Sequence, residues 1–501
     1  MKLGLISVVV ASLLGSIAAC GGSTDPVPTP PATPDPVPPA ETDAGVVAPP
    51  AVKPTACSAP LTTPTCATVK PAPTSGPDVS AFITGNAVPL RCDDGAGGKA
   101  VWDLRPLVQL YGDQKMFMVG EVHGTNEIGI LSSLLLEQLA TKDLVNVVAS
   151  ELPMDFAPAL ERYVETGNDP MASQLLDRGA PNFFGAILTK KARALYERGV
   201  KLKVGAVDIP YSPQTAVVAI EEVAAKLTTQ KDVVLTTLPK NAQEPPTSDD
   251  IANVKTYFDL IMSKKTEICA ELSADDCDRL NAMTHALWAS TLTYDRTGQS
   301  EVWFERREVA IYYNMHALMA RPTDRMFLHM GAAHTNKHSF SAGSRMSQEY
   351  PLTKGKVFSI APAYGTGSVI WYGQDQKLPG EPQSIVSALT DAPAHPMFIS
   401  TTRPSAACDG NPVGQEPDDT VGAGGTRGQL YDGYVHYGKL TSERRPNDTK
   451  FERDGEVLSS GPTPSGRTAL DRLLAFRARI EQREREAIAA GVLTRRAATR
   501  R

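Results

Sequence analysis

The sequence predicts an α/β fold: an open, mainly parallel sheet with flanking helices and a helical insertion. Four apolar, strand-like runs each lead into an acidic residue or a histidine at their carboxyl end. Because the carboxyl ends of parallel strands meet at one edge of a sheet, a parallel sheet explains this recurrence. The runs and the polar residues that follow them are Lys115–Val119 before Glu121 and His123, Leu144–Ser150 before Glu151, Leu202–Val207 before Asp208, and Arg325–Met330 before His334.

The spacing of apolar residues becomes helical in residues 212–321, which we interpret as a helical insertion in a globular domain of residues 80–440. The helices expected there are Gln214–Thr229, Ser248–Ser273, Ala274–Tyr294 and Glu301–Arg321. Further strands are expected at Lys356–Ile360, Val369–Tyr372 and Tyr434–Tyr437. The formal net charge of −6 gives no support for nucleic-acid binding.

The N-terminus has the pattern of a bacterial lipoprotein signal peptide, predicted over residues 1–20. Lys2 precedes the apolar stretch Leu3–Leu14, and small residues lead to Cys20, where we expect cleavage and lipidation. The apolar stretch is too short to span a bilayer. We therefore expect an exported protein that is anchored in the cell envelope through Cys20. No Asp follows Cys20 to indicate inner-membrane retention, so the outer membrane is the expected location.

Residues 21–79 are rich in Pro and Thr and have almost no aromatic residues, which predicts an extended stalk. Residues 441–501 form an Arg-rich tail with helical apolar spacing from about Arg467 to Ala490. This helix either packs on the domain or contacts an anionic lipid or polymer through its terminal arginines. The sequence leaves both possibilities open.

Six cysteines remain after lipidation, and an even number in an exported protein favours disulfides. Proximity in the sequence suggests two pairs, and the third would join the two ends of the domain, although six cysteines allow fifteen pairings. The expected bonds are Cys57–Cys66, Cys269–Cys277 and Cys92–Cys408.

The turn from Gly120 to Glu127 concentrates chemically active side chains, with Glu121, His123 and Glu127 inside eight residues. The alternative is a polar turn in which Thr125 or Asn126 only caps a helix. The sequence lacks a serine nucleophile elbow, a zinc-protease helix and a phosphate-binding loop. What remains is a set of Glu, His, Arg and Asp residues that can activate water and stabilise an oxyanion.

The other histidines are not expected to belong to this site. His329 alternates with apolar residues in its strand, so a core position is the better interpretation. The same applies to histidines in predicted helices, in the terminal strand or beside a proline: His285, His316, His436 and His395.

The motifs together resemble the erythromycin-esterase-like proteins and their relatives, the ChaN-type haem-binding lipoproteins and the Tiki/TraB-type proteins. The resemblance rests on Gly120-Glu121-x-His123-Gly124-Thr125-x-Glu127, Glu151, Asp208, Arg307-Glu308 with Asn314, His334, and the closing run Tyr431–Tyr437. The single residue between Glu121 and His123 is similar to the ChaN and Tiki branches. The Gly124-Thr125-x-Glu127 sequence and the closing run are similar to the esterase branch.

The resemblance implies a hydrolase that acts on a small-molecule ester, lactone or amide and requires no cofactor. His123 would be the general base, while Glu121 and Glu151 would orient and polarise the water. Arg307 and His334 would stabilise the oxyanion, and Asp208 and Glu127 would hold these residues in place. The alternatives are a ChaN-like haem-binding protein and a Tiki-like hydrolase with a divalent metal at Glu121, His123 and His334.

Overall fold

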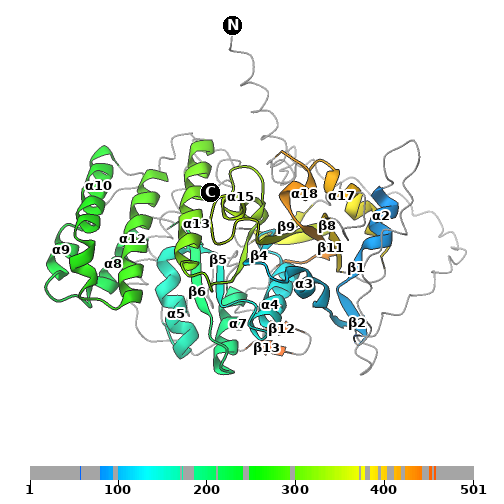
Figure 1. Cartoon of the computed structure of the whole chain (residues 1–501), viewed down its shortest axis with the longest axis horizontal. Coiled ribbons are helices and arrows are strands. Elements are labelled where there is room, and N and C mark those ends of the chain that lie inside the picture. Colours follow the sequence, from blue (N-terminus) through cyan, green and yellow to red (C-terminus); the bar gives the residue numbers. More distant parts are fainter. Residues whose placement is uncertain are drawn as a thin grey trace, which may run out of the picture.

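A computed structural model describes most of the globular part of the chain (Figure 1). The described residues are 57, 79–93, 100–169, 172, 186–209, 213–240, 247–293, 300–371, 374–378, 384–392, 396–402, 411–418, 424–442, 451–453 and 456–458. Cys20, the signal peptide, nearly all of the stalk and the predicted helix in the tail lie outside these residues. Their predicted roles are therefore not tested by the structure.

The centre of the fold is a nine-stranded, mixed sheet with the order β1-β10-β11-β8-β4-β7-β5-β6, in which β9 pairs with β8. The six strands from β11 to β6 are parallel to their neighbours, whereas β1, β9 and β10 pair antiparallel. This confirms the predicted α/β class with a mainly parallel sheet. The strands are β1 Val88–Pro89, β4 Met116–Glu121, β5 Val147–Pro153, β6 Lys203–Asp208, β7 Met326–Gly331, β8 Val357–Trp371, β9 Gln374–Leu378, β10 Met397–Ser400 and β11 Gly433–Leu440.

Alternation along the central strands divides their side chains between two apolar layers. On β4, Phe117 and Val119 pack in one core cluster with α4, α5 and α7, while Met116 and Met118 pack in another with α13 and α15. Helices thus cover both faces of the sheet, which explains why the central strands are almost wholly apolar. The helices of the first face are α3 Arg105–Tyr111, α4 Asn126–Ala140, α5 Ala157–Thr166 and α7 Ala186–Glu197. On the second face, α15 is Ala342–Gln348.

The segment between β6 and β7 is helical, as the apolar spacing predicted, and it forms its own apolar cluster. In Figure 1 its helices lie beyond the β6 edge of the sheet, with α13 nearest to the strands. These helices are α8 Pro213–Ala224, α9 Lys231–Thr236, α10 Ser248–Ser263, α11 Lys265–Cys269, α12 Ala274–Thr293 and α13 Ser300–Leu318. The expected helix Ser248–Ser273 is therefore divided into α10 and α11.

Smaller elements complete the fold at its β10–β11 end and at its periphery. Helix α16 and α2 pack together and contribute to one further apolar cluster beside β11. The remaining elements are α2 Val79–Asn86, β2 Arg91–Asp93, β3 Ala100–Trp102, the 3-10 turn η2 Met154–Phe156, α14 Ala332–Thr335, α16 Ser384–Leu389, α17 Pro412–Gln415, α18 Arg427–Leu430, β12 Phe451–Arg453 and β13 Glu456–Leu458. The β12–β13 hairpin lies in the region that was predicted as a helical tail.

Strand β8 is continuous where the sequence predicts two separate strands, Lys356–Ile360 and Val369–Tyr372. It is one strand of 15 residues, although Pro362, Gly365 and Gly367 suggest a break. Strand β4 pairs with β8 only up to Ile360, so the proline lies beyond this pairing, where a missing N–H is tolerated. A Cβ on Gly367 would lie 2.8 Å from the Cβ of Leu440, so glycine permits the close approach of β11.

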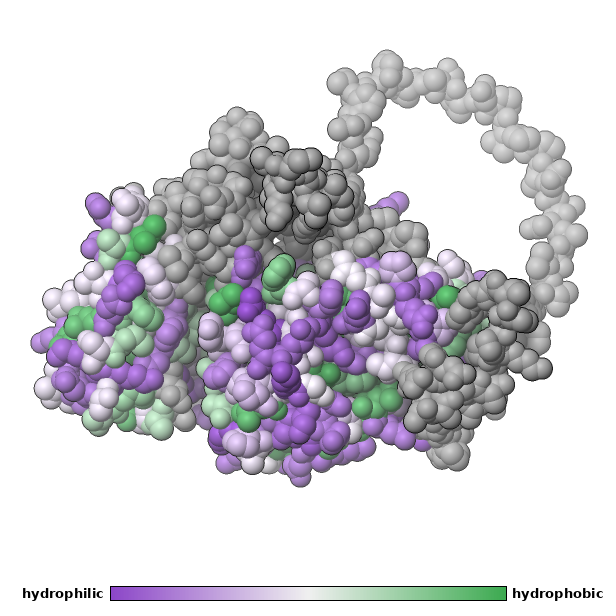
Figure 2. Space-filling model, turned by 45° about the horizontal axis from the view of Figure 1, so that its top comes forward, coloured by the Kyte–Doolittle hydropathy of each residue, from purple (hydrophilic) through white to green (hydrophobic). Residues whose placement is uncertain are grey.

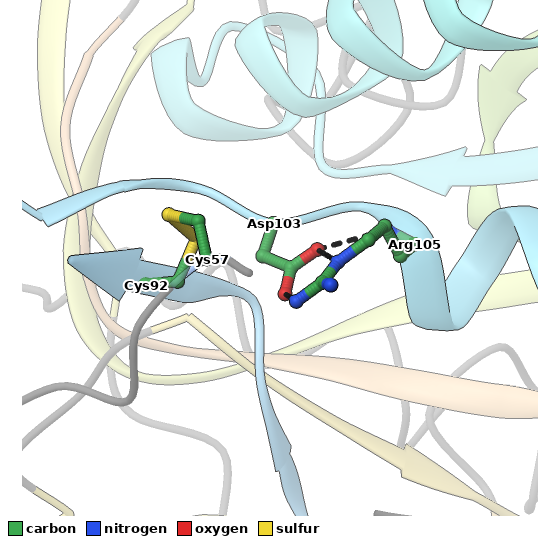
Figure 3. The surroundings of a disulfide bond; sticks show 4 residues. All are labelled: Cys57, Cys92, Asp103 and Arg105. Carbon is green, nitrogen blue, oxygen red and sulfur yellow. Dashed lines mark hydrogen bonds and ion pairs between the residues drawn. A yellow bond between two sulfur atoms is a disulfide. The ribbon is translucent and has the colours of Figure 1, made fainter. Parts of the chain in front are cut away.

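Two disulfides are present among the described cysteines, and one of them overturns the predicted pairing. Cys269 bonds Cys277, as expected, but Cys57 bonds Cys92 (Figure 3). The predictions of Cys57–Cys66 and Cys92–Cys408 bonds are therefore wrong, because each requires a sulfur that is already in the Cys57–Cys92 bond. The pairing follows the fold instead of the sequence: the β2–β3 hairpin carries Cys92, whose Cα lies 4.9 Å from that of Cys57.

Among the described residues, no helix has both the length and the apolar character to cross a membrane. The face in Figure 2 is mixed, with hydrophilic residues in broad areas and hydrophobic residues in small groups. Scattered apolar residues of this kind are ordinary on a folded protein. The described surface in this view therefore gives no separate indication of a binding face.

Candidate functional site

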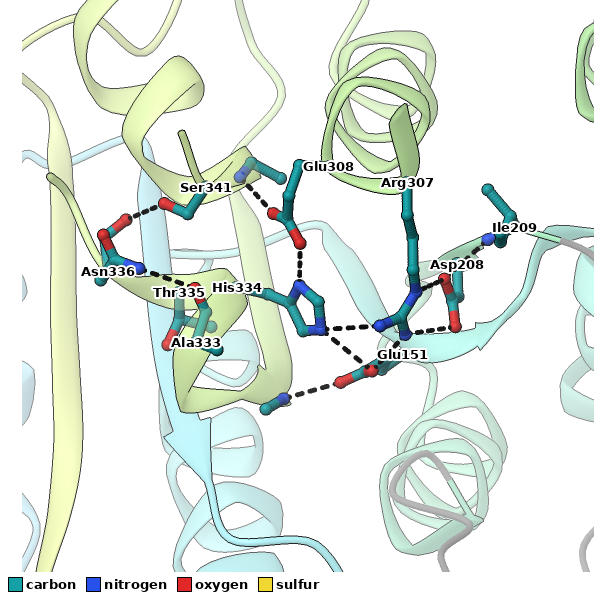
Figure 4. A network of polar contacts seen from close by, with 12 residues as sticks. Glu151, Asp208, Ile209, Arg307, Glu308, Ala333, His334, Thr335, Asn336 and Ser341 are labelled. Atoms are coloured by element: carbon teal, nitrogen blue, oxygen red, sulfur yellow. Dashed lines mark hydrogen bonds and ion pairs between the residues drawn. The ribbon is translucent and has the colours of Figure 1, made fainter. Parts of the chain in front are cut away.

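The polar residues at the strand ends come together at the carboxyl edge of the sheet, as predicted. Glu121 ends β4, Glu151 lies near the end of β5, and Asp208 ends β6. Helix α13 brings Arg307 from the helical insertion, and His334 lies in α14 directly after β7. Figure 4 shows Arg307 pointing from α13 toward Glu151 and Asp208, with His334 between Glu308 and this group.

His123 lies between two carboxylates that contact opposite nitrogens of its ring. Its Nδ1 is 3.1 Å from Oε1 of Glu121, and its Nε2 is 3.7 Å from Oε2 of Glu151. Its side chain is 24% exposed, whereas those of Glu121 and Glu151 are 3% and 4% exposed. His123 is therefore the member of this trio that a substrate can reach.

The turn that carries His123 depends on two glycines. Gly124 has a φ of +76°, a left-handed conformation that glycine adopts without strain. At Gly331, a Cβ would lie 2.9 Å from Cε1 of His123, so only glycine leaves room for the ring. Thr125 lies at the N-cap of α4, but its hydroxyl donates to the carbonyl of Val122, so it does not form the side-chain cap of the alternative interpretation.

Burial lowers the pKa of His123, but the charges of Glu151 and Glu121 oppose it, and the resulting pKa lies above the ordinary histidine value. Burial raises the pKa of Glu121, yet His329 and His123 lower it more strongly, so Glu121 stays ionised. The pKa of Glu151 is well below the usual range, because His334 and His123 outweigh its burial. The trio thus combines two carboxylates with an imidazole that loses its proton at a higher pH than an ordinary histidine does.

Arg307 joins the ends of β5 and β6. Its Nε and Nη2 donate to the two oxygens of Asp208 at 2.8 and 2.7 Å, and Nη2 also donates to Glu151 at 2.6 Å. Burial lowers its pKa, but Asp208 and Glu151 raise it to well above the ordinary arginine value. Glu151 also accepts from the backbone N–H of Gly331 at 2.7 Å, so Arg307 and Gly331 together hold Glu151.

His334 is a second buried cation beside Arg307. Its Nδ1 donates to Glu308, and its Nε2 lies 3.3 Å from Glu151 and 3.1 Å from Nη1 of Arg307. Burial lowers its pKa, but Glu308 and Glu151 raise it to about 10. Glu308 in turn accepts from the backbone N–H of Ala342 at 2.6 Å, which ties α13 to α15.

The overall architecture is shared with several solved structures. A Bacillus cereus protein superposes with a TM-score of 0.58 at 16% identity, over 73% of this chain and 97% of that one. A succinoglycan biosynthesis protein superposes with a TM-score of 0.56 at 14% identity, over 73% of this chain and 97% of that one. A mutant of erythromycin esterase EreC, in its open conformation, gives 0.52 at 12% identity over 68% of this chain and 95% of that one. This chain has the erythromycin-esterase-like fold.

At these identities the likeness shows the fold alone, and it confirms the sequence resemblance at that level. A haem-binding ChaN protein of Campylobacter jejuni gives a TM-score of 0.26, which carries no argument. No family model and no curated protein matches the sequence. Evidence for the function of this chain therefore comes from its own residues.

Six of the seven predicted site residues belong to the network of polar contacts that joins His123, Arg307 and His334, and Glu127 does not. The six are Glu121, His123, Glu151, Asp208, Arg307 and His334. Glu127 lies in the first turn of α4, where its carboxylate accepts from the backbone N–H and the hydroxyl of Thr441, at the end of β11. Asn314 is a structural contact, since its amide donates to the carbonyl of Val207 on β6.

Two network members were not assigned a role from the sequence. Glu308, which was noted only beside Arg307, orients His334. His329, which was interpreted as a core residue, is 1% exposed and contacts Oε2 of Glu121 through its Nε2 at 2.9 Å. No sequence signal separated His329 from a core histidine, because apolar residues surround it in its strand.

The metal set predicted from the sequence does not fit this geometry. The ring nitrogens of His334 already contact Glu308 on one side and Arg307 with Glu151 on the other, and a cationic guanidinium would repel a metal ion. Ligand atoms of Glu121, His123 and Glu151 do lie within 4.8 Å of one another. These three side chains, with Glu151 in place of His334, are therefore the group in the described part of the chain that could hold a metal ion.

Proposed function

We propose that this chain is a hydrolase that uses water to cleave a small-molecule ester, lactone or amide. The observation that supports this most directly is the partly exposed His123, held between Glu121 and Glu151 beside the Arg307 and His334 cations. A base next to buried positive charge is the arrangement that acyl transfer to water requires. The fold shared with an erythromycin esterase supports the same class of reaction.

In the proposed reaction, Nδ1–H of His123 donates to Glu121, and the lone pair of Nε2 accepts a proton from water. The water oxygen forms a bond to the carbonyl carbon, and the oxyanion lies near Arg307. When the bond to the leaving group breaks, the proton on Nε2 passes to the departing oxygen or nitrogen. Arg307 is the cation that substrate reaches more easily, because its side chain is 14% exposed and that of His334 is 5% exposed.

We also propose, from the sequence, that the chain is exported and attached to the cell envelope through lipidated Cys20. The substrate would then be a small molecule at or outside the membrane. Labelling of intact cells with a lipid precursor tests this attachment. Incorporation that Cys20→Ala abolishes is expected, and unchanged incorporation in that variant contradicts it.

Turnover by the purified full chain tests the hydrolase directly. We expect hydrolysis within a panel of model esters, lactones and amides, and His123→Ala should lower the rate by about 10²- to 10⁴-fold. His285→Ala is the matched control, because His285 is an exposed histidine of the helical insertion that contacts Phe258 edge to face. Near-wild-type turnover by His123→Ala contradicts the proposal.

The sequence-based alternatives have distinct outcomes in the same preparation. A stoichiometric Soret band after addition of haem, with no hydrolysis across the panel, would favour a haem-binding protein. Loss of turnover on chelation, restored by one divalent metal, would favour a metal-dependent hydrolase. Turnover that survives chelation without a bound chromophore supports the proposed mechanism.

A further inference from the structure

A second buried imidazole contacts the carboxylate that holds His123. His329 lies in β7, and both of its ring nitrogens have partners: Nε2 contacts Oε2 of Glu121 at 2.9 Å, and Nδ1 contacts the hydroxyl of Ser132 at 2.8 Å. Ser132 is 0% exposed and belongs to α4. A continuous chain of contacts therefore runs from Ser132 through His329 and Glu121 to His123.

Sheet register explains why His329 reaches Glu121. Val119 of β4 pairs with His329 of β7, and Glu121 lies two residues further along β4, on the same face as Val119. This is the face covered by α4, where Val119, Ile128 and Leu135 belong to the apolar core. A histidine in such surroundings is costly unless its nitrogens are hydrogen-bonded, and here they are.

The partners of His329 determine where its proton lies. Nε2 faces a carboxylate oxygen, which only accepts, so Nε2 must carry a hydrogen. Nδ1 then accepts from the Ser132 hydroxyl, which can both donate and accept. The Ser132 hydroxyl thus gives Nδ1 a partner in the tautomer of His329 that donates to Glu121.

This donation leaves Glu121 with a defined role toward His123. Oε2 of Glu121 accepts from His329, so Oε1 is directed to Nδ1 of His123 at 3.1 Å. Because Oε1 is also only an acceptor, Nδ1 of His123 carries the hydrogen. In neutral His123 the lone pair is therefore on Nε2, the nitrogen that faces Glu151.

We propose that His329, supported by Ser132, is a positioning residue that fixes Glu121 and thereby keeps the basic lone pair of His123 on Nε2. His329 does not touch the substrate in this proposal. Its kinetic consequence rests on the proposed hydrolase function, whereas its effect on the tautomer of His123 does not.

The experiment compares His329→Asn with His329→Gln in the full chain. The Gln amide reaches the position of Nε2 and can still donate to Glu121, whereas the shorter Asn amide reaches the position of Nδ1 and contacts only Ser132. The two variants are matched in polarity, and neither carries charge. Nuclear magnetic resonance of isotope-labelled histidine at alkaline pH reports the tautomer of neutral His123, whose signal is identified by its loss in His123→Gln.

We expect wild type and His329→Gln to keep His123 mainly in the form with hydrogen on Nδ1, and His329→Asn to contain a mixture. With para-nitrophenyl butyrate as the substrate, kcat of His329→Asn should fall about 10- to 100-fold with little change in KM, as is typical when a partner that orients a functional histidine is lost. Ser132→Ala should shift the tautomer in the same direction to a smaller extent.

Identical His123 tautomers and kinetics in the folded Asn and Gln variants would overturn the proposal. If His329→Asn does not fold, Ser132→Ala decides, and a wild-type tautomer in that variant overturns it. A tautomer shift in His329→Asn, together with full activity in His123→Ala, would instead uphold the positioning role and reject the hydrolase mechanism.

Discussion

At the scale of single residues, the two carboxylates around His123 set the pH at which it can act as a base. Burial lowers its pKa, but Glu151 and Glu121 raise it to a net value above 6.5. Since a general base must be neutral, kcat/KM should rise with pH, and the midpoint should lie above 6.5. The pH profile of a substrate found in the panel checks this expectation.

The Glu151→Gln variant tests whether the charge of Glu151 raises the pKa of His123. It removes a negative charge that favours protonated His123, so the pKa falls and the rising limb of the profile moves to lower pH. Glu197→Gln, at an exposed surface pair with Arg193, is the control and should leave the midpoint in place. A rising limb that stays in place or moves to higher pH in Glu151→Gln contradicts the assignment.

Arg307 makes its contribution to stability by neutralising buried carboxylates. Arg307→Ala would leave Asp208 and Glu151, each with a 4% exposed side chain, without their guanidinium partner. Loss of one partner of a buried pair typically costs about 3–5 kcal/mol in the free energy of unfolding. Urea denaturation at neutral pH measures this cost.

Arg198→Ala is the surface control for that measurement. Arg198 is 51% exposed and pairs with Glu137, so its loss should cost about 0–1 kcal/mol. Equal stability of the two variants would show that the Arg307 pairs contribute no more than a surface ion pair.

At the scale of secondary-structure elements, the sequence predicted the strands that carry the site because parallel strands have an unmistakable pattern. Each of these strands is mainly apolar and has a polar site residue near or just beyond its carboxyl end, so β4, β5, β6 and β7 were placed correctly to within a few residues. The extent of β8 was missed, since Pro362 and the following glycines are typical of turns. Their place in a strand depends on the neighbours β4 and β11, which a local pattern does not contain.

The same limit explains the site residues that were misjudged. Glu127 is close to His123 in sequence but turns toward Thr441, because α4 begins at Asn126 and directs it to the end of β11. His329 has apolar neighbours in sequence, and only the register of β7 with β4 shows that it meets Glu121. Proximity in sequence therefore predicted the strand ends but not the partners of each side chain.

Gly120 allows α14, which carries His334, to lie against the end of β4. A Cβ at this position would lie 2.8 Å from Oγ1 of Thr335 and 3.1 Å from Cα of Ala332. In Gly120→Ala we therefore expect α14 to shift and kcat/KM to fall by roughly tenfold or more, since a displacement of about 1 Å can cost 100-fold in rate. Steady-state kinetics, with circular dichroism to confirm folding, measure this effect.

Gly85→Ala is the matched control, because a Cβ at Gly85 in α2 would meet no atom within 4 Å. It should keep wild-type kinetics. Wild-type kinetics in both variants would show that α14 tolerates the added methyl group without displacing His334.

At the scale of the whole molecule, the two disulfides between described cysteines close loops of different length. The Cys57–Cys92 bond joins residues 35 apart, and the Cys269–Cys277 bond joins residues 8 apart. In the chain-entropy model these closures contribute about 4 and about 2.5 kcal/mol, respectively. Replacing both cysteines of the first pair by serine should therefore lower stability more than the same change in the second pair, as measured by urea denaturation.

Peptide mapping without reduction tests the pairing itself. A fragment that joins Cys57 to Cys92 is expected from the oxidised chain. A fragment that joins Cys92 to Cys408 would contradict the structure and restore the pairing suggested by the sequence.

The position of His334 between Glu308 and Glu151 also makes unfolding a source of protons. The pKa of His334 is about 10 in the fold and near 6.5 in an unfolded chain, so its stabilising contribution is complete below pH 6.5 and is lost as the pH rises through about 10. Between these limits the folded protein binds a proton that the unfolded chain releases, and the buffer takes it up. Protonation of an amine buffer releases more heat than protonation of phosphate, so calorimetry in mildly alkaline solution should give a smaller apparent enthalpy of unfolding in the amine buffer.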